Sequence, residues 1–274
     1  MTMAACDPLG ALAEQLGNAC PEIEIKDPAA LQGELSTLVR WLDHVFEGMA
    51  LEGGAERIDA SDRIEQSILE TAGFFESFPA ETLVDLHDRR AQTPAVCYQC
   101  YPRLSEHTLD HLGLWTCAAR CGRNEKHPGI GRFRTFSMRE IVLLGSAQQV
   151  RDERARWMEK ISDFARSLEI NVELRSAADC FFATEELRGR RLLQQVKGLK
   201  FELQASGDVL GSGMAIASFN LHETFFARRF RLKLRDGSDA YSGCIAFGLE
   251  RWALAIVLRL GPERAFALAK EKVA

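Results

Sequence analysis

Two arginines and an aromatic residue are spaced as a site for nucleotide phosphates would require. Arg123-Asn124-Glu125 precedes a short Gly/Pro-containing loop, and Arg132-x-x-x-Phe136-x-x-x-Glu140 follows it. Two strands joined by such a loop would bring Arg123 and Arg132 close together. A guanidinium group can hold phosphate oxygens, and an aromatic ring can cover a flat purine. The segment could therefore form a nucleotide site, but arginine and glutamate residues taken alone fit an exposed charged hairpin better.

Cysteines supply a second set of candidate ligands. Of the eight cysteines, four are closely spaced, as Cys97-x-x-Cys100 and Cys117-x-x-x-Cys121, and could close a four-sulfur structural zinc site. The first residues, Met1 to Asp7, have neither the basic stretch nor the apolar core of a secretory leader, so we expect a cytoplasmic protein. In that compartment, cysteines are more often metal ligands, reactive groups or core residues than disulfides.

Charge and composition weigh against nucleic acid and membrane partners. The formal net charge is −5, whereas nucleic-acid binding rests mainly on cationic contacts with phosphates. No apolar run approaches the roughly 20 residues that a membrane-crossing helix needs. Hydrophobic residues make up 46% of the chain and charged residues 27%, as is usual for a globular enzyme.

The elements that would position these residues are predicted to form an α+β fold, with an antiparallel sheet flanked by helices. The predicted helices start at Asp27-Pro28 and at Ser61, and two more span Gln148–Leu168 and Leu249–Leu260, the last ended by Gly261-Pro262. The predicted strands are Arg132–Leu144, Leu199–Ala205, Phe230–Leu234 and Tyr241–Phe247, the last two joined by a turn at Asp236-Gly237. We expect a helical N-terminal segment over residues 1–60 that packs on a larger domain over residues 61–274.

The segment from Arg123 to Glu140 resembles motif 2 of class II aminoacyl-tRNA synthetases. The resemblance implies that Arg123 holds the α-phosphate of ATP and that Glu125 helps to position the adenine. It further implies that Arg132 reaches the outer phosphates and that Phe136 stacks on adenine.

Two other segments resemble the remaining class II motifs. Gly248-Leu249-Glu250-Arg251 resembles motif 3, which implies that Arg251 packs on the adenine and contacts the γ-phosphate. Gly73-Phe74 to Phe78-Pro79 approximates motif 1, the dimer-forming element, in a looser spacing. On this resemblance we expect a homodimer and a class II synthetase-like catalytic domain over residues 61–274, with no tRNA-binding domain.

The stretch from Pro94 to Leu260 is similar to amino acid:[carrier protein] ligases, which resemble the catalytic core of methanogen-type seryl-tRNA synthetases. The shared segments are Phe136-Ser137-Met138-Arg139-Glu140, Asp179-x-Phe181-Phe182, Leu199-Lys200-Phe201-Glu202, Ser218-Phe219-Asn220-x-His222 and Cys244-x-x-Phe247-Gly248-Leu249-Glu250-Arg251. Ala227-Arg228-Arg229, in addition, resembles the end of a serine-rich segment of seryl-tRNA synthetases.

This resemblance implies one catalytic zinc ion per chain, held by Cys97, Glu140 and Cys244. Three protein ligands leave an open fourth position on Zn²⁺, which the amino group of a substrate can fill. The four-sulfur site remains the alternative. Asn220 and His222, with Ser218 beside them, would line or brace the amino-acid pocket, or would have a buried, hydrogen-bonded structural role. Glu202 would either help to hold Mg²⁺ or lie at the surface as a strand-end carboxylate.

The implied reaction is the ATP- and Mg²⁺-dependent activation of glycine or alanine, followed by transfer to the phosphopantetheine thiol of a carrier protein. A basic cluster could receive an acidic carrier helix or form a solvated helix face, and consists of Arg188, Arg190, Arg191, Lys197 and Lys200. Two other classes of function stay open. One is a catalytically silent paralogue that binds nucleotide or protein, and the other is a residual tRNA-aminoacylating enzyme.

Overall fold

The structure is a computed structural model that describes residues 33–78, 84–85, 87–124, 131–177, 197–207, 210 and 213–271. Several predicted features lie outside the described residues. They are the helix start at Asp27-Pro28, the adenine-side Glu125, the Asp179-x-Phe181-Phe182 segment and the basic residues Arg188, Arg190 and Arg191.

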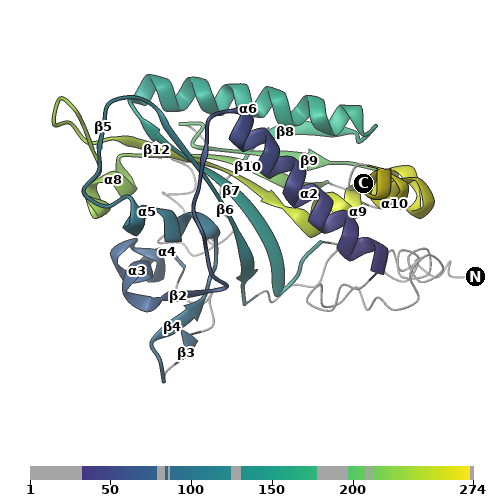
Figure 1. Ribbon diagram of the computed structural model, residues 1–274, viewed down its shortest axis with the longest axis horizontal. Coiled ribbons are helices and arrows are strands. Elements are labelled where there is room, and N and C mark those ends of the chain that lie inside the picture. The colour runs from purple at the N-terminus through teal and green to yellow at the C-terminus, as the bar shows by residue number, and fades with distance from the viewer. Residues whose placement is uncertain are drawn as a thin grey trace, which may run out of the picture.

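A seven-stranded sheet forms the centre of the fold (Figure 1). Its order is β1 (Glu56–Arg57), β6 (Gly113–Gly122), β7 (Thr135–Gly145), β12 (Tyr241–Gly248), β10 (Met214–Glu223), β9 (Lys200–Ala205) and β8 (Val172–Ser176). Only β1 and β6 pair in parallel, and the other neighbours are antiparallel. The predicted antiparallel sheet is therefore confirmed.

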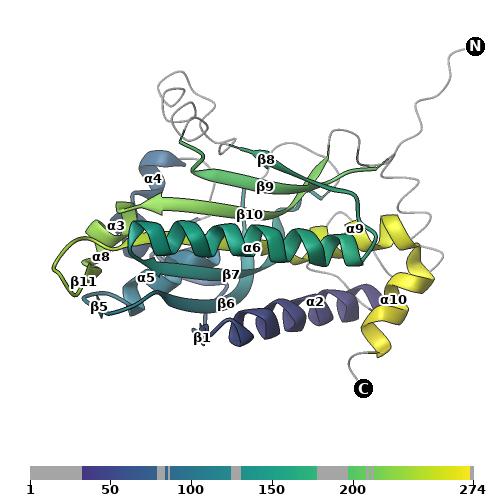
Figure 2. The ribbon, with the colours of Figure 1, turned by 90° about the horizontal axis from the view of Figure 1, so that it is seen from above.

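In the described part of the chain, four helices share a hydrophobic core with one face of this sheet (Figures 1 and 2). They are α2 (Gly33–Glu52), α6 (Ala147–Ser167), α9 (Leu249–Leu260) and α10 (Pro262–Glu271). The first three pack directly on the strands, and the last packs on the first and third helices. In the middle of the core, the ring of Phe46 on α2 stacks on Phe247 of β12, with centroids 4.1 Å apart, and meets Trp252 edge-on. Helix α2 makes up most of the described part of the expected N-terminal segment, and its apolar side packs into this core. The same segment also contains strand β1, which joins the sheet.

The other face of the sheet is covered by short elements. The 3-10 turn η2 (Val96–Gln99), helix α5 (Cys100–Arg103) and helix α8 (Phe225–Phe230) pack against β6, β7, β10 and β12 in a second core. A small lobe adjoins it, with the strands β2 (Arg63–Glu65), β4 (Arg90–Gln92) and β3 (Val84–Asp85) and the helices α3 (Gln66–Thr71) and α4 (Phe74–Ser77). Strands β5 (Thr108–Leu109) and β11 (Lys233–Leu234) form a separate pair.

Sequence signals at the ends of helices were informative. Ser146 caps α6 in a reciprocal capping box with Gln149, and α9 has the predicted bounds. The turn at Asp236-Gly237 is confirmed, since Gly237 has φ +83° and its amide donates to the carbonyl of Leu234 at 2.9 Å.

Two predicted elements are wrong. The helix expected from Ser61 begins only at Gln66, because Ile64 lies in β2 and pairs with Ala91, where its side chain is buried. The strand expected over Phe230–Leu234 is mostly absent. Phe230 ends helix α8, and Arg231 takes a left-handed conformation with φ +55°. Phe226 and Phe230, four residues apart, instead share the face of α8 that packs on Tyr101.

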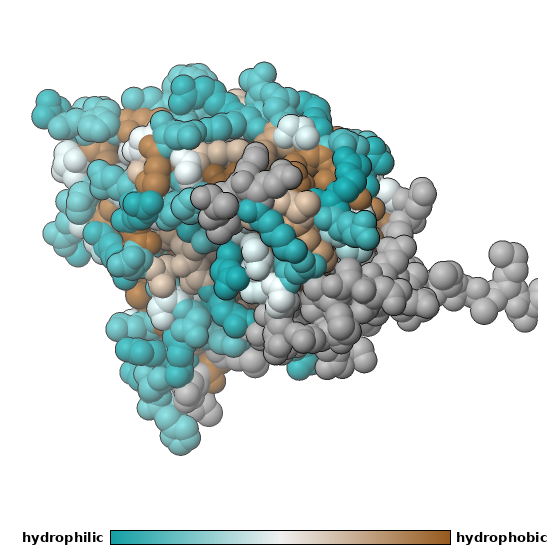
Figure 3. All heavy atoms as spheres, turned by 45° about the vertical axis from the view of Figure 1, so that its right-hand side comes forward, coloured by the Kyte–Doolittle hydropathy of each residue, from teal (hydrophilic) through white to brown (hydrophobic). Residues whose placement is uncertain are grey.

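The surface agrees with this layered arrangement. On the side seen in Figure 3 it is mostly hydrophilic, with hydrophobic side chains showing between the charged ones in patches. Within the described part of the chain, no helix is both long enough and apolar enough to cross a bilayer. Gly73 and Phe74, expected in a dimer-forming motif, lie in the small lobe, where Phe74 packs with Ile64, Leu69 and Ala91.

Candidate active site

Three predicted metal ligands converge on the face of the sheet that η2 covers. Cys97 comes from η2, Glu140 from β7 and Cys244 from β12, and all three side chains are buried. Glu140 and Cys244 lie on adjacent strands, two positions apart in register, because Cys244 pairs with Val142 and Glu140 with Ala246. The candidate ligand atoms, two sulfurs and one carboxylate oxygen, all lie within 4.8 Å of one another.

Hydrogen bonds hold the carboxylate of Glu140 in place. Its Oε1 accepts a bond from the backbone N–H of Val96 at 2.7 Å, and its Oε2 accepts one from the thiol of Cys244 at 3.2 Å. The amide of Asn220 also approaches the sulfur of Cys244, at 3.6 Å. The turn that carries Cys97 is thus tied to the glutamate by the residue directly before it.

Burial and the charge of Glu140 raise the pKa of both thiols. The pKa of the Cys97 thiol is raised well above its usual value by its hydrogen bond with Cys244, by burial and by the charge of Glu140. For Cys244, the hydrogen bond with Cys97 lowers the pKa, but burial and the charge of Glu140 outweigh it and the net shift is upward.

This set of donors fits a zinc ion. Thiolate and carboxylate ligands bind Zn²⁺ at about 2.0–2.3 Å, and sulfur ligands favour it over Mg²⁺ or Ca²⁺. Three such groups so close together can share one ion, and a set of three protein ligands is typical of sites that leave a position for substrate. Cys97, Glu140 and Cys244 are therefore the residues that would hold it.

Metal binding at these residues should release protons. Because zinc binds the thiolate form, an ion entering the site must displace protons from thiols whose pKa is raised. The apparent affinity is therefore expected to rise with pH, by up to about 100-fold per pH unit if both thiol protons leave. Chelator competition at several pH values measures this slope, and an indicator dye in weak buffer counts the protons. An affinity independent of pH would contradict thiolate ligation here.

The alternative four-sulfur site does not form. Cys117 and Cys121 lie four residues apart on β6, which places them about 13 Å from each other along a strand. Cys100 and Cys117 do meet, with their sulfurs 3.1 Å apart. Over the described residues, however, the only cluster of three or more His, Cys, Asp or Glu ligand atoms is that of Cys97, Glu140 and Cys244. Cys100, Cys117 and Cys121 are buried thiols of the second core.

The predicted pocket residues share one side of β10. Ser218, Asn220 and His222 alternate along this strand, and the side-chain amide of Asn220 donates to the hydroxyl of Ser218 at 3.2 Å. The Nδ1 atom of His222 lies 3.2 Å from the hydroxyl of Tyr101. These residues adjoin the cluster through the contact of Asn220 with Cys244.

Tyr101 was missed by the sequence analysis. It is fully buried and stacks on Phe226 at 4.4 Å between ring centroids. Burial, together with the charges of Cys97 and Cys244, raises the pKa of its hydroxyl well above the usual value. Its position four residues after Cys97, in the first helical turns beyond that ligand, was the available signal. Tyr101 therefore places an uncharged polar side chain beside the cluster.

Glu202 lies on β9 opposite Ser218 and forms an ion pair with Lys200 at 3.3 Å. Its carboxylate is therefore on the same side of the sheet as the pocket residues, and is partly buried rather than at the surface. A role in holding Mg²⁺ stays a prediction.

The residues predicted to bind the nucleotide lie at the other end of this face. Arg123 follows the end of β6, its Nε donates to the carbonyl of Pro94 at 3.0 Å, and its guanidinium lies 5.1 Å from the ring centre of Phe136. The structure thus brings Arg123 and Phe136 together. The predicted proximity of Arg123 and Arg132 stays a prediction. Arg132 is exposed in the segment that precedes β7.

Arg251, in the first turn of α9, is fixed by two backbone carbonyls. Its Nε donates to Gly131 at 2.6 Å and its Nη1 to Ala215 at 3.0 Å. The neighbouring Glu250 is buried, and both of its carboxylate oxygens lie 2.8 Å from the backbone N–H of Ser137 on β7. Burial raises the pKa of Glu250 despite these bonds. The start of α9 is thereby attached to β7 and to the end of the loop that precedes it.

Solved structures identify the class of fold. The chain has the fold of the catalytic core of class II seryl-tRNA synthetases. It matches the Methanopyrus kandleri enzyme, solved in complex with A. aeolicus tRNASec, with a TM-score of 0.73 and 17% identity, over 87% of this chain and 56% of that one. It matches the Pyrococcus horikoshii enzyme complexed with ATP with a TM-score of 0.72 and 15% identity, over 95% and 62% of the two chains.

Sequence comparison adds two groups of similar proteins. The chain is similar to amino acid–[acyl-carrier-protein] ligase 1 of Bradyrhizobium diazoefficiens, with 34% identity over 166 residues, which is 60% of this chain and 51% of that protein. It is 26% identical over 185 residues to the type-2 serine–tRNA ligase of Methanothermobacter thermautotrophicus, covering 62% of this chain and 34% of that one. The chain thus spans about half the length of the carrier-protein ligase and a third of the tRNA ligase. No protein-family model matches the sequence.

Proposed function

We propose that the protein activates a small amino acid with ATP and transfers it to the phosphopantetheine thiol of a carrier protein. The observation that carries this proposal is the convergence of Cys97, Glu140 and Cys244 on a class II synthetase-like sheet. The same face of that sheet carries Arg123 beside Phe136. An amino-acid site and a nucleotide site would then lie side by side.

In the first step, a carboxylate oxygen of the amino acid attacks the α-phosphorus of ATP, and pyrophosphate leaves. Arg123 and Arg251 would stabilise the charge on the phosphate oxygens, and Phe136 would cover the adenine. The zinc ion, when bound, supplies a Lewis-acidic position for the amino group of the substrate. Ser218, Asn220 and His222 would surround the substrate, so that the carboxylate is held for attack.

In the second step, the sulfur of a thiol attacks the carbonyl carbon of the aminoacyl adenylate. AMP leaves, a thioester forms, and the thiol proton passes to the solvent or the phosphate. Glycine or alanine is the proposed substrate, as the resemblance of the sequence to amino acid:[carrier protein] ligases implies. Asn220, 3.6 Å from the sulfur of Cys244, and His222, 3.2 Å from the hydroxyl of Tyr101, would line its site. We further propose that Mg²⁺ binds together with ATP and that the protein forms a homodimer.

A second candidate is aminoacylation of tRNA. Its support is the similarity to type-2 serine–tRNA ligases and to solved seryl-tRNA synthetases. Against it stand the net charge of −5 and the higher identity to the carrier-protein ligase.

The test is ATP–pyrophosphate exchange with each standard amino acid, with zinc determined on the same sample. We expect exchange with glycine or alanine and about one zinc ion per chain. Transfer of the activated amino acid is then measured to phosphopantetheinylated carrier proteins and to bulk tRNA. Exchange with no amino acid in folded, zinc-containing protein would favour a silent binding paralogue. Salt-sensitive charging of tRNA would favour the second candidate.

A further inference from the structure

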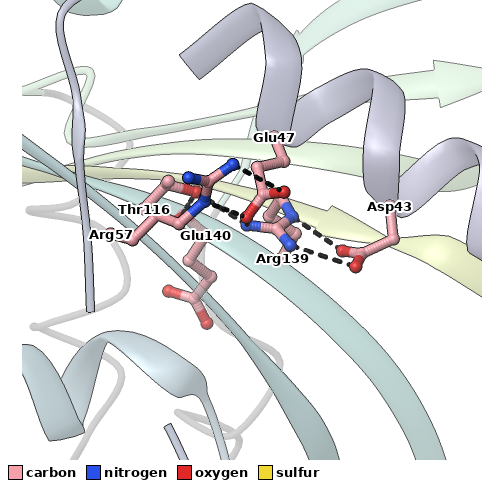
Figure 4. A network of polar contacts seen from close by, with 6 residues as sticks. All are labelled: Asp43, Glu47, Arg57, Thr116, Arg139 and Glu140. Carbon is pink, nitrogen blue, oxygen red and sulfur yellow. Dashed lines mark hydrogen bonds and ion pairs between the residues drawn. The ribbon is translucent and has the colours of Figure 1, made fainter. Parts of the chain in front are cut away.

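A buried arginine lies directly behind the proposed metal site. Arg139 precedes Glu140 on β7, so their side chains point to opposite faces of the sheet, as Figure 4 shows. Glu140 faces η2 and the cysteines, whereas Arg139 faces helix α2. The guanidinium side chain is only 6% exposed, although a buried charge is costly unless it is paired.

Helix α2 supplies the charges that Arg139 requires. Asp43 accepts two parallel bonds from it, from Nε at 2.6 Å and from Nη2 at 3.0 Å, and Glu47 lies 3.4 Å from Nη1. Glu47 is also held by Arg57 of β1 at 3.0 Å. Asp43 and Glu47 are one helical turn apart, so α2 presents both to the same spot. A planar, two-bond pair of this kind fixes orientation as well as charge.

Thr116 connects this arginine to the backbone of the metal ligand. Its hydroxyl accepts a bond from Arg139 Nη1 at 3.1 Å and donates one to the carbonyl oxygen of Glu140 at 3.2 Å. Thr116 is itself buried on β6, and its own carbonyl accepts a bond from the N–H of Ile58, just after β1. A continuous path of hydrogen bonds therefore runs from α2 through the sheet to the residue that carries the carboxylate ligand.

We propose that Asp43, Glu47, Arg57, Thr116 and Arg139, here called the Arg139 network, position Glu140 for metal binding and couple the docking of α2 to the metal site. The proposal rests on the proposed metal site. Asp43 and Thr116 are positioning residues, since they touch no ligand side chain in the cluster. By linkage, an ion that binds only when Glu140 is correctly placed also strengthens the docking of α2.

A merely structural network makes a different prediction. If the pairing serves only to neutralise Arg139, its loss would lower stability and leave metal affinity unchanged. Groups that orient metal ligands through hydrogen bonds typically change affinity when they are removed. A measurement of metal affinity on folded protein therefore distinguishes a network that only neutralises Arg139 from one that positions Glu140.

The test uses two near-isosteric substitutions in the full chain, Asp43→Asn and Thr116→Val. Zn²⁺ affinity is measured by chelator competition, and the coordination geometry by the absorption spectrum of the Co²⁺-substituted protein. We expect each variant to bind Zn²⁺ about 10–100-fold more weakly and to show altered cobalt bands. Because both act along one path, the double variant should lose less than the product of the two single losses.

Matched controls are available in the same chain. Glu34→Gln removes another partly exposed, ion-paired carboxylate of α2, which contacts Lys270. Ser162→Ala removes another buried hydroxyl that donates to a backbone carbonyl, that of Met158 at 2.6 Å. Both should keep the zinc affinity and cobalt spectrum of the unchanged protein. Thr116→Ser, which restores the hydroxyl, should recover most of the affinity lost in Thr116→Val.

The outcomes distinguish the two proposals. Zinc affinity and cobalt bands unchanged in Asp43→Asn and Thr116→Val would overturn the role of the network while leaving the metal site intact. No metal binding by the unchanged protein would overturn both. If Thr116→Val fails to fold, hydrogen exchange of α2 with and without Zn²⁺ decides the matter in the unchanged protein. Slower exchange with metal supports the coupling, and equal exchange contradicts it.

Discussion

Replacement of Cys244 by alanine is expected to remove bound metal and ATP–pyrophosphate exchange together. The thiol of Cys244 is one of three candidate ligands, and it also donates to Glu140 at 3.2 Å. Two remaining ligands would hold Zn²⁺ weakly, because a buried site with three protein ligands loses a third of its protein coordination. We expect less than about a tenth of the original metal content after dialysis and exchange reduced by at least about 100-fold.

The matched control is Cys117→Ala. Cys117 is equally buried and lies directly opposite Glu140 on the neighbouring strand, but its sulfur contacts Cys100 instead of the cluster. This variant should keep both metal and activity, with only a modest loss of stability. If Cys117→Ala loses the metal and Cys244→Ala retains it, the ligand assignment is wrong and a site built on Cys100 and Cys117 takes its place.

The fold was predictable where local signals and burial agree. Helix α9 begins after Gly248 and ends at Gly261, and its apolar positions all face the core, so its bounds could be read directly. The strand predicted over Phe230–Leu234 is wrong for a physical reason. The alternating apolar and basic residues fit a strand. Phe226 and Phe230, however, also lie one helical turn apart, and the helix forms because it lets both rings pack on Tyr101.

The candidate site was predictable only through resemblance. Spacing alone favoured the four closely placed cysteines, whereas the cluster joins residues as distant in sequence as Cys97, Glu140 and Cys244. Cross-strand register brings the last two together, and one sequence does not reveal that register. The Arg139 network had a fainter signal. Arg139 and Glu140 are the only charged residues of strand β7, and Asp43 and Glu47 lie one turn apart on the amphipathic helix α2.

These observations assign different tasks to the two faces of one strand. On one face of β7, Glu140 joins the two cysteines, and on the other Arg139 joins the helical layer. Nearer the start of β7, the ring of Phe136 lies beside Arg123, and the backbone N–H of Ser137 donates to Glu250. The proposed metal ligand, the docking of α2 and the proposed nucleotide contacts therefore all depend on the register of a single central strand. This explains why so much of the proposed chemistry lies within residues 136–140.

Arg123→Lys is expected to abolish most of the activation step while metal binding stays intact. A lysine keeps the positive charge but loses the planar set of donors that can bond the carbonyl of Pro94 and a phosphate oxygen in fixed directions. It also loses the stacked arrangement over Phe136. Removing one aligned donor for transition-state charge typically lowers the rate by about 10²–10³-fold, so we expect a fall of that size in the exchange rate at saturating ATP.

The control for this change is Arg166→Lys on α6, where an exposed arginine pairs with the exposed carboxylate of Asp163. That variant should exchange pyrophosphate at the original rate, because surface pairs contribute little and this one lies on the helical side of the sheet. Zinc content should be the same in both variants. An Arg123→Lys protein with the exchange rate of the control would show that this arginine does not contact the reacting phosphate. The nucleotide would then have to be placed elsewhere on the sheet, even if the metal site stands.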